Sequence, residues 1–221
     1  MSAGGFGSRL RKILMFKNRR EAGQKLAKKL EVYRGAKAIV IALPRGGVVV
    51  GYEVARALSL PFDIIVVRKI GHPTNPEYAI GAVDEIGTTI LNEDETATVD
   101  TEWLREEIAR EQKEAKRRSL LYRKGRKSPN LSGKIIIIVD DGIATGLTMR
   151  LAVRSVKAQK PEKIIVAVPV ASAESLRVEK DEGAHEIVVL EPPEEFVGAV
   201  GAHYLRFEQV EDEEVIRLLH P

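Results

Sequence analysis

The chain has 221 residues, of which 44% are hydrophobic, so it is long enough to bury the core of one α/β domain and too short for two domains of equal size. It has no cysteine, which excludes disulfide bonds and thiolate metal sites, and its four histidines lack the spacing of zinc ligands. A formal net charge of +3 suits an anionic substrate but is too small to indicate a nucleic-acid partner. Because no apolar run is long enough for a signal peptide or a membrane span, we expect a cytoplasmic protein with no membrane partner.

The apolar residues predict alternating helices and strands along the chain. Small and apolar residues at helical spacing predict an amphipathic helix over 18–33. Compact apolar runs predict strands over 38–43, 62–67, 135–139, 163–170 and 186–190, and the segments between them predict helices over 48–58, from 101 to shortly before Gly125, over 147–159 and from 173 onward. Asp100 or Thr101 is expected to cap the long charged helix.

Two further segments carry different signals. Residues 70–82 are rich in glycine and proline, so we expect no regular structure there, whereas residues 82–92 alternate well enough for a small hairpin that turns near Gly87. The tail from Pro192 onward is expected to be irregular.

Strands and helices that alternate at these lengths predict an α/β fold with a doubly wound, mainly parallel sheet. We expect one domain over residues 1–221. It would have a core at about 36–191, a flexible loop and hairpin at about 70–92, and a C-terminal hood or tail at about 192–221.

The strand over 135–139 ends in two carboxylates and a turn of small residues that opens a helix. Asp140 and Asp141 come first. The turn consists of Gly142, Ile143, Ala144, Thr145, Gly146, Leu147 and Thr148. Its small residues let backbone N–H groups converge on a phosphate at the N-terminus of the helix, and its two threonines add hydroxyl donors. The carboxylates would repel a phosphate, so they are expected to face sugar hydroxyls or a positive charge such as hydrated Mg²⁺.

This run resembles the 5-phosphoribosyl 1-diphosphate (PRPP) signature of type I phosphoribosyltransferases. The resemblance implies that Asp140 and Asp141 hold the ribose 2′- and 3′-hydroxyls and meet Mg²⁺ only through these hydroxyls or water. Residues 142–148 would wrap the 5′-phosphate. It further implies transfer of the phosphoribosyl group to a nitrogenous base with release of pyrophosphate, a role in nucleotide metabolism, and a homodimer. A strand that ends in an ordinary helix-capping turn is the structural alternative.

A second turn is expected at the same edge of the sheet. Pro44, Arg45, Gly46 and Gly47 follow the strand over 38–43, and they resemble the family's pyrophosphate loop, in which a cis peptide bond would join Pro44 to Arg45. A plain type II turn would also fit these residues.

Arg68 and Lys69 follow the strand over 62–67 and are expected to neutralise the same pyrophosphate. We therefore assign catalytic roles to Asp140, Asp141, Arg45 and Lys69.

The acceptor is less well defined. Type I enzymes for 6-oxopurines carry an aspartate where this chain has Ala144, which disfavours hypoxanthine and guanine. Within 70–82, three residues could contact an acceptor or transfer a proton, and two aromatic residues of the tail could stack on a base or belong to the core. The three are His72, Glu77 and Tyr78, and the two are Phe196 and Tyr204.

Two alternatives to a transferase remain open. The same fold serves in PRPP-binding regulatory proteins with little or no transferase activity, and hydrolysis or phosphorolysis of PRPP-like sugars would use the same anion sites. The basic stretch over 105–127 is interleaved with glutamates, as on a solvated helix, and this disfavours nucleic acid. That helix or the hairpin near Gly87 could form a dimer interface.

Overall fold

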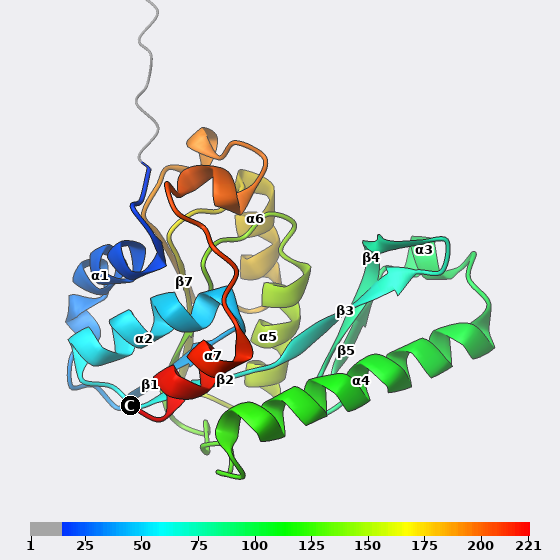
Figure 1. Ribbon diagram of the computed structural model, residues 1–221, viewed down its shortest axis with the longest axis horizontal. Helices are drawn as coiled ribbons and strands as arrows, with labels where there is room; N and C mark the ends of the chain where they lie inside the picture. The colour runs from blue at the N-terminus through cyan, green and yellow to red at the C-terminus, as the bar shows by residue number, and fades with distance from the viewer. Residues whose placement is uncertain (1–14) are drawn as a thin grey trace, which may run out of the picture.

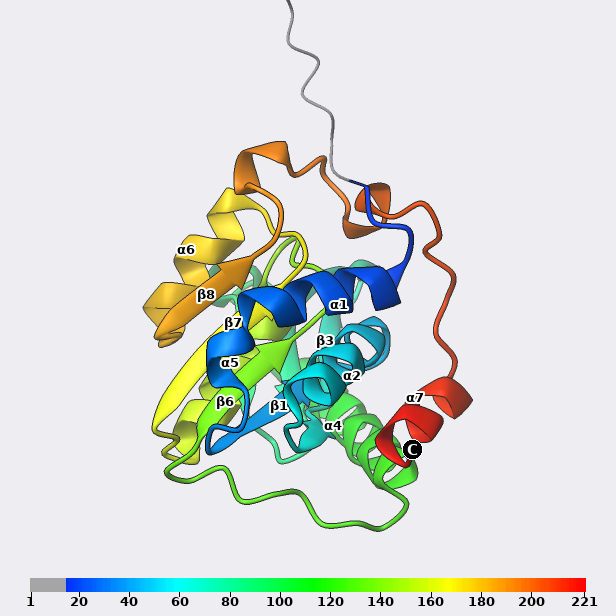
Figure 2. The ribbon, with the colours of Figure 1, turned by 90° about the vertical axis from the view of Figure 1, so that its left-hand side faces the viewer.

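A five-stranded parallel sheet forms the centre of the protein, in the strand order β2–β1–β6–β7–β8. The computed structural model describes residues 15–221, and residues 1–14 lie outside it. The strands are β1 (Ala38–Ala42), β2 (Phe62–Ile64), β6 (Ile135–Val139), β7 (Lys163–Val168) and β8 (Glu186–Val189). The covering helices are α1 (Arg19–Lys29), followed by a 3₁₀ turn η1 (Glu31–Tyr33), α2 (Gly46–Leu58), α5 (Leu147–Ala158) and α6 (Ala173–Glu182). Helices α1 and α2 cover one face, and α5 and α6 the other (Figures 1 and 2). The predicted α/β fold with a mainly parallel sheet is confirmed.

Strand β6 is apolar throughout because both of its faces are buried. Ile136 and Ile138 pack on the side of α5, whereas Ile137 and Val139 pack on the side of α1 and α2. All four side chains are fully buried. This is the environment of a central strand in a parallel sheet.

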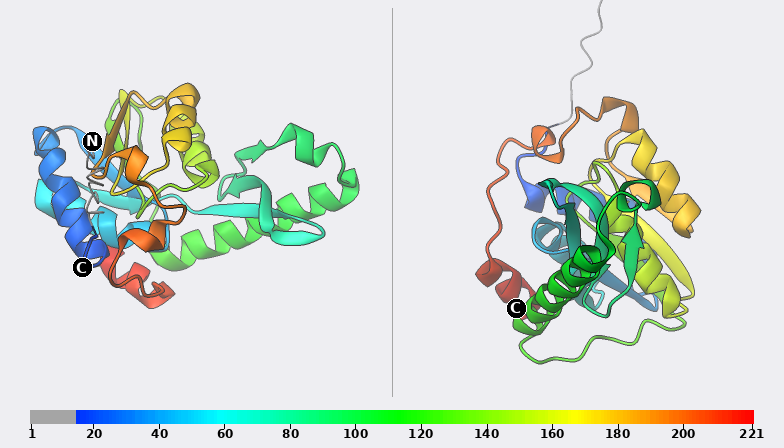
Figure 3. Two further views of the ribbon diagram at one scale, coloured as in Figure 1. Left: turned by 90° about the horizontal axis from the view of Figure 1, so that it is seen from above. Right: turned by 90° about the vertical axis from the view of Figure 1, so that its right-hand side faces the viewer.

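After Ile64 the chain leaves the parallel sheet and forms a separate unit, here called the arm (residues 67–123). Its strands are β3 (Val67–His72), β4 (Asn75–Asp84) and β5 (Thr89–Leu91), its helices are α3 (Glu93–Thr96) and α4 (Thr101–Arg123), and the strands pair in antiparallel fashion. Figures 1 and 3 show α4 running along the strands as the arm extends away from the parallel sheet. As predicted, the Asp100 side chain caps α4, accepting a hydrogen bond of 2.8 Å from the backbone N–H of Trp103.

The expectation that residues 70–82 lack regular structure was wrong, because their glycines permit close strand pairing. A Cβ on Gly71 would lie 2.3 Å from the carbonyl oxygen of Pro76, and a Cβ on Gly81 would lie 2.8 Å from that of Ile90. Only glycine leaves room for neighbouring backbone at such distances.

The predicted hairpin near Gly87 is confirmed by the pairing of β4 with β5. The predicted strand over 62–67 is instead two strands, β2 and β3, which belong to different sheets.

The expectation of an irregular tail was wrong at its end. After two short 3₁₀ turns, η2 (Pro193–Glu195) and η3 (Val200–His203), the chain forms helix α7 (Asp212–Leu219). Val215, Leu218 and Leu219 recur at helical spacing, and their buried side chains belong to one cluster with residues of α2 and α4. Within residues 15–221, no helix is both long enough and apolar enough to cross a membrane.

Replacing Leu218 with alanine is expected to lower the free energy of unfolding by about 2–5 kcal/mol, because it leaves a cavity between α7 and the helices beneath it. Urea denaturation measures the change. Arg217→Ala, at an exposed neighbouring position, serves as the control and should change stability by less than about 0.5 kcal/mol. Equal stability of the Leu218 variant and the parent would contradict this packing.

Candidate functional site

Two turns meet at the carboxyl edge of the parallel sheet, as the sequence predicted. Strands β1 and β6 are paired up to Ala42 and Val139, so the turns that follow them lie side by side. A Cβ on Gly46 would lie 2.0 Å from Oδ2 of Asp141, and a Cβ on Gly47 would lie 2.7 Å from Oδ1 of Asp140. The two glycines are therefore required for the carboxylates to approach the first turn.

The first turn also has the backbone conformation that the resemblance implied. The peptide bond between Pro44 and Arg45 is cis. Arg45 is the N-terminal flanking residue of α2, and no side chain caps this helix end. The N–H groups of Gly46 and Gly47 are therefore available to an anion, whereas that of Val48 donates to the backbone oxygen of Arg45.

The carboxylate of Asp141 faces a positive charge, and that charge is Arg19 of α1. The Nε of Arg19 donates to Oδ2 of Asp141 at 2.7 Å, and both side chains are largely buried. The Tyr204 hydroxyl donates to the backbone oxygen of Asp141 at 2.6 Å. The Asp140 carboxylate accepts a hydrogen bond of 2.8 Å from the backbone N–H of Asp141 and forms no ion pair with residues 15–221.

Burial dominates the electrostatics of this acidic pair. It raises the pKa of Asp140 well above its ordinary value, and the neighbouring charge of Asp141 raises it further. Burial also raises the pKa of Asp141, although the charge of Arg19 opposes this shift. The pair therefore favours a ligand that donates hydrogen bonds or carries positive charge.

Arg19 is the site residue that sequence reasoning missed. Its guanidinium carbon lies 3.7 Å from the centre of the Phe207 ring, and its Nη1 donates to the backbone oxygen of Glu208 at 2.7 Å. The helical pattern places Arg19 among the basic residues of α1. Its partner Asp141 is 122 positions away along the chain, and no local signal joins the two.

The loop over 142–148 leads into a helix end that no side chain caps. Gly146 has a positive φ of 82° and precedes α5, and no side chain caps this helix. The loop is held from behind, because the N–H of Ile143 donates to Val170 and the Ser172 hydroxyl donates to the backbone oxygen of Ala144, each at 2.9 Å. Ala144 and Thr145 are exposed. Free N–H groups at the start of a twelve-residue helix suit a phosphate.

A buried glutamate of α6, Glu179, lies directly behind this loop. Its Oε1 is 3.1 Å from the position of a Cβ on Gly146, and neither carboxyl oxygen has a hydrogen-bond partner within residues 15–221. Burial raises the pKa of Glu179 to about 8, with Arg150 opposing the shift and Glu182 adding to it. The side chain is therefore mostly neutral at pH 7.

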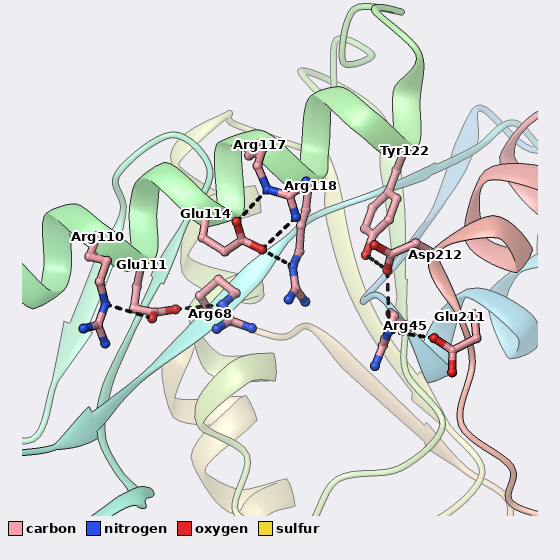
Figure 4. A network of polar contacts seen from close by, with 10 residues as sticks. All are labelled: Arg45, Arg68, Arg110, Glu111, Glu114, Arg117, Arg118, Tyr122, Glu211 and Asp212. Carbon is pink, nitrogen blue, oxygen red and sulfur yellow. Dashed lines mark hydrogen bonds and ion pairs between the residues drawn. The ribbon is translucent and has the colours of Figure 1, made fainter.

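The predicted pyrophosphate cations lie in two separate elements. Nη1 of Arg45 is 3.5 Å from the Glu211 carboxylate and 3.6 Å from that of Asp212, and Nε of Arg68 donates to Glu111 of α4 at 2.7 Å (Figure 4). Arg68 and Lys69 lie inside strand β3 of the arm, and not at the end of a strand of the parallel sheet as predicted. The cause is the exit of the chain from that sheet at Ile64.

Lys69 nevertheless lies near the loop over 142–148. It lines a cavity of about 500 Å³ together with Thr145, Leu147 and Arg150, and other residues of the arm form the wall on its own side. Glu77 and Tyr78 belong to that wall, so two of the acceptor candidates lie next to the site. His72 lies at the β3–β4 turn, where its Nδ1 is 2.9 Å from the Thr74 hydroxyl.

The aromatic residues of the tail pack against other rings. Phe196 stacks on His203 with 5.4 Å between ring centres, and Tyr204 lies between Phe16 and Phe207 at 5.5 and 5.0 Å. Their geometry is that of core packing, which was the alternative to base stacking.

Comparisons with known proteins identify the family. The family model for the phosphoribosyl transferase domain matches residues 12–205. The chain belongs to this family. Two proteins of Mycobacterium tuberculosis, named "Putative phosphoribosyl transferase MT0597" and "Putative phosphoribosyl transferase Rv0571c", are each 40% identical to it over 213 residues, covering 93% of this chain and 46% of their own length. This phosphoribosyl transferase domain thus spans about half the length of the curated relatives that it matches. The crystal structure of TT1426 from Thermus thermophilus is 42% identical and has a TM-score of 0.77, with coverage of 93% of this chain and 97% of that one.

Replacing Arg19 with methionine is expected to lower the free energy of unfolding by about 3–5 kcal/mol, because the substitution leaves the buried Asp141 carboxylate without a partner. Chemical denaturation measures the loss. Arg20→Met is the control, since Arg20 is far more exposed and should contribute less than about 1 kcal/mol. A loss no larger than that of the control would show that the Arg19–Asp141 pair does not hold the site together.

Replacing Glu179 with glutamine tests the neutral carboxyl. Because the pKa rises from 4.5 to about 8 on folding, the parent has its full stability below pH 4.5 and loses it as the pH rises towards 8. Glutamine stays neutral, so the parent should become less stable than Glu179→Gln by about 1.4 kcal/mol for each pH unit within this window. Unfolding curves at pH 5 and pH 8.5 give the difference, and a difference that does not change with pH would rule out the neutral carboxyl.

Proposed function

We propose that this chain binds PRPP together with Mg²⁺ and transfers the phosphoribosyl group to a nitrogenous base, releasing pyrophosphate. The observation that carries the proposal is the contact between the turn of Gly46 and Gly47 and the carboxylates of Asp140 and Asp141, which joins an anion-binding helix end to a ribose-binding acidic pair. Family membership supports the class of reaction. The chain spans about half the length of its curated relatives, so the activity of a whole protein of that length is also part of this proposal.

Each part of the site would bind one part of PRPP. Backbone N–H groups and hydroxyls of residues 142–148 would hold the 5′-phosphate, and Asp140 and Asp141 would accept hydrogen bonds from the ribose hydroxyls. Pro44, Arg45, Gly46 and Gly47 would hold the pyrophosphate together with Arg68 and Lys69. Arg19 would keep Asp141 ionised and oriented while the ribose binds.

The reaction is a displacement at C1′ of the ribose. The acceptor nitrogen forms a bond to C1′ as the bond from C1′ to the pyrophosphate oxygen breaks, and that oxygen keeps the electron pair. Arg45 and Lys69 would stabilise the charge that develops on the leaving oxygen. Asp140 and Asp141 would place negative charge beside the ribose as it becomes cationic.

Mg²⁺ fits the site only as a partner of the substrate. Within residues 15–221, no group of three or more histidine and acidic side chains could hold a metal ion by itself. Asp140 and Asp141 are two carboxylates, so they would meet Mg²⁺ through PRPP hydroxyls or water. When bound, the ion supplies positive charge to the pyrophosphate oxygens.

For the acceptor, Ala144 leaves the loop without the aspartate of 6-oxopurine enzymes, and the arm offers Glu77 and Tyr78 beside Lys69. We therefore favour a nitrogenous base other than hypoxanthine or guanine. The cytoplasmic location and the homodimer remain predictions.

Calorimetric titration with PRPP and Mg²⁺, followed by addition of a panel of free bases, tests the proposal. Release of pyrophosphate with one base identifies the acceptor and establishes the transferase. Tight binding of PRPP without turnover with any base would instead favour the regulatory alternative, and absence of binding would contradict both.

Replacing Asp140 with asparagine is expected to lower kcat/KM for PRPP by roughly ten- to two-hundredfold, because a hydrogen bond to a charged group is worth about 1.5–3 kcal/mol. Asp141→Asn should act in the same range. Steady-state kinetics measure the loss, and Asp181→Asn, on the exposed face of α6, is the matched control. Full activity of both site variants would refute the assignment of the acidic pair.

A further inference from the structure

One stripe of helix α4 faces the arginines assigned to pyrophosphate. Its members are Glu111, Glu114, Arg118 and Tyr122, spaced three, four and four residues apart. At one end, Glu111 holds Arg68 of the arm at 2.7 Å. At the other end, the Tyr122 hydroxyl donates to Asp212 at 2.7 Å, and Asp212 in turn faces Arg45.

Arg118 lies between these two ends. Figure 4 shows its guanidinium group on the same side of α4 as those of Arg68 and Arg45, and between them. The electrostatics of Tyr122 support this placement. Burial and the bond to Asp212 raise the pKa of Tyr122 to about 12, while the charges of both Arg118 and Arg45 oppose that shift. Both guanidinium groups therefore act on the same hydroxyl.

The way in which Arg118 is held leaves its donors free. Its Nε donates to Glu114 at 2.7 Å, and its two terminal nitrogens have no hydrogen-bond partner within residues 15–221. Arg68 is held in the same way, by Nε alone, to Glu111. In each case a carboxylate orients the guanidinium group. The Arg118 and Arg68 side chains are 28% and 31% exposed, so the terminal nitrogens of each group, here called its fork, are open to a ligand.

Arg117, the neighbour of Arg118, is bound differently. It donates through both Nε and Nη2 to Glu114, at 2.7 and 3.0 Å, and its side chain is 58% exposed. Hydrogen bonds from Arg117 and Arg118 together lower the pKa of Glu114 to about 2, so this carboxylate stays ionised and keeps both arginines in place. Of these two neighbouring arginines, only Arg118 keeps both terminal nitrogens without a partner within residues 15–221.

We propose that Arg118 is a third guanidinium of the pyrophosphate site, binding the diphosphate group of PRPP and the released diphosphate together with Arg45 and Arg68. The inference rests on the proposed function. A diphosphate carries several negative charges on two adjacent phosphates, and forked donors on successive arginines match its oxygens in pairs. Along α4, Arg118 lies seven positions beyond Glu111, a rise of about 10 Å, which puts it between the arginines held at the two ends of the stripe. The Arg45 contacts, at 3.5 and 3.6 Å, are long enough for the ligand to replace them.

Calorimetry with two ligands tests the role of Arg118. Magnesium diphosphate probes the arginine row, whereas ribose 5-phosphate probes the loop over 142–148 and the acidic pair and carries no diphosphate. Arg118→Ala is expected to weaken diphosphate binding about tenfold, which corresponds to about 1.4 kcal/mol, and to leave ribose 5-phosphate binding within twofold. Arg118→Lys should recover part of the loss, since it restores the charge without the fork.

Arg117→Ala is the matched control, because Arg117 lies in the same turn of α4 as Arg118 and pairs with the same carboxylate, that of Glu114. It should leave both affinities within twofold. Unchanged diphosphate binding in Arg118→Ala, or equal losses in the two alanine variants, would overturn the role of Arg118.

Failure of the inference is distinguishable from failure of the proposed function. If Arg45→Ala loses diphosphate and Arg118→Ala does not, the pyrophosphate site stands without Arg118. If the parent protein binds neither PRPP nor diphosphate, the proposed function fails and the inference with it. A parallel loss of ribose 5-phosphate in Arg118→Ala would assign that residue a general structural role and would also overturn the inference.

Discussion

One buried guanidinium group, that of Arg123, joins the arm to the parallel sheet. Its Nε donates to Asp63 of β2 at 2.9 Å, its Nη1 lies 3.3 Å from Glu85 in the turn after β4, and its Nη2 donates to the backbone oxygen of Ile64. Only 5% of Arg123 is exposed, so loss of Asp63 would leave this desolvated charge with Glu85 as its remaining acidic partner. Burial raises the pKa of Glu85 to about 7 even though Arg123 opposes this shift. The network therefore fixes where the chain leaves the sheet.

The site depends on that exit point. Because β3 starts just beyond the Arg123 network, Lys69 comes to lie across a cavity from Thr145 and Leu147, and Arg68 comes to lie beside α4. Helix α4 ends at the same network, and its residue Tyr122 is linked through Asp212 to Arg45 in the turn after β1. The outer part of the arm is held by apolar packing, in which Ile70 and Ile80 of the strands meet Trp103 and Ile108 of α4. Polar contacts thus fix the arm at its base, and hydrophobic burial keeps its helix straight along the strands.

Features set by short stretches of sequence could be predicted, and those set by distant partners could not. The apolar run over 135–139 predicted a buried strand, and the carboxylates and small residues that follow it predicted the site. The structure brings these residues and the turn after β1 together at one edge of the sheet. The pairing of β3 with β4 was missed because glycine and proline indicate a break unless the pairing strand is known, and Gly71 and Gly81 are required by that pairing. Helix α7 was missed because its periodic pattern is short, with only four apolar residues in eight positions. Arg19 and Arg118 carry no sequence signal, since their roles depend on contacts that the fold alone creates.

The segment from Tyr204 to Asp212 supports both halves of the site. Near its start, Phe207 and the backbone oxygen of Glu208 hold Arg19, which in turn neutralises Asp141 at 2.7 Å. A few residues later, Glu211 and Asp212 face Arg45 at distances about 0.8–0.9 Å longer than this, near the limit for a hydrogen bond. Replacing a long, partly solvated contact costs less than breaking a short, buried one, since little Coulomb energy is lost in water. Under the proposed function, a diphosphate would therefore replace Glu211 and Asp212 at Arg45 while Arg19 and Asp141 stay paired, so the carboxylates proposed to hold the ribose would keep their geometry as Arg45 exchanges partners.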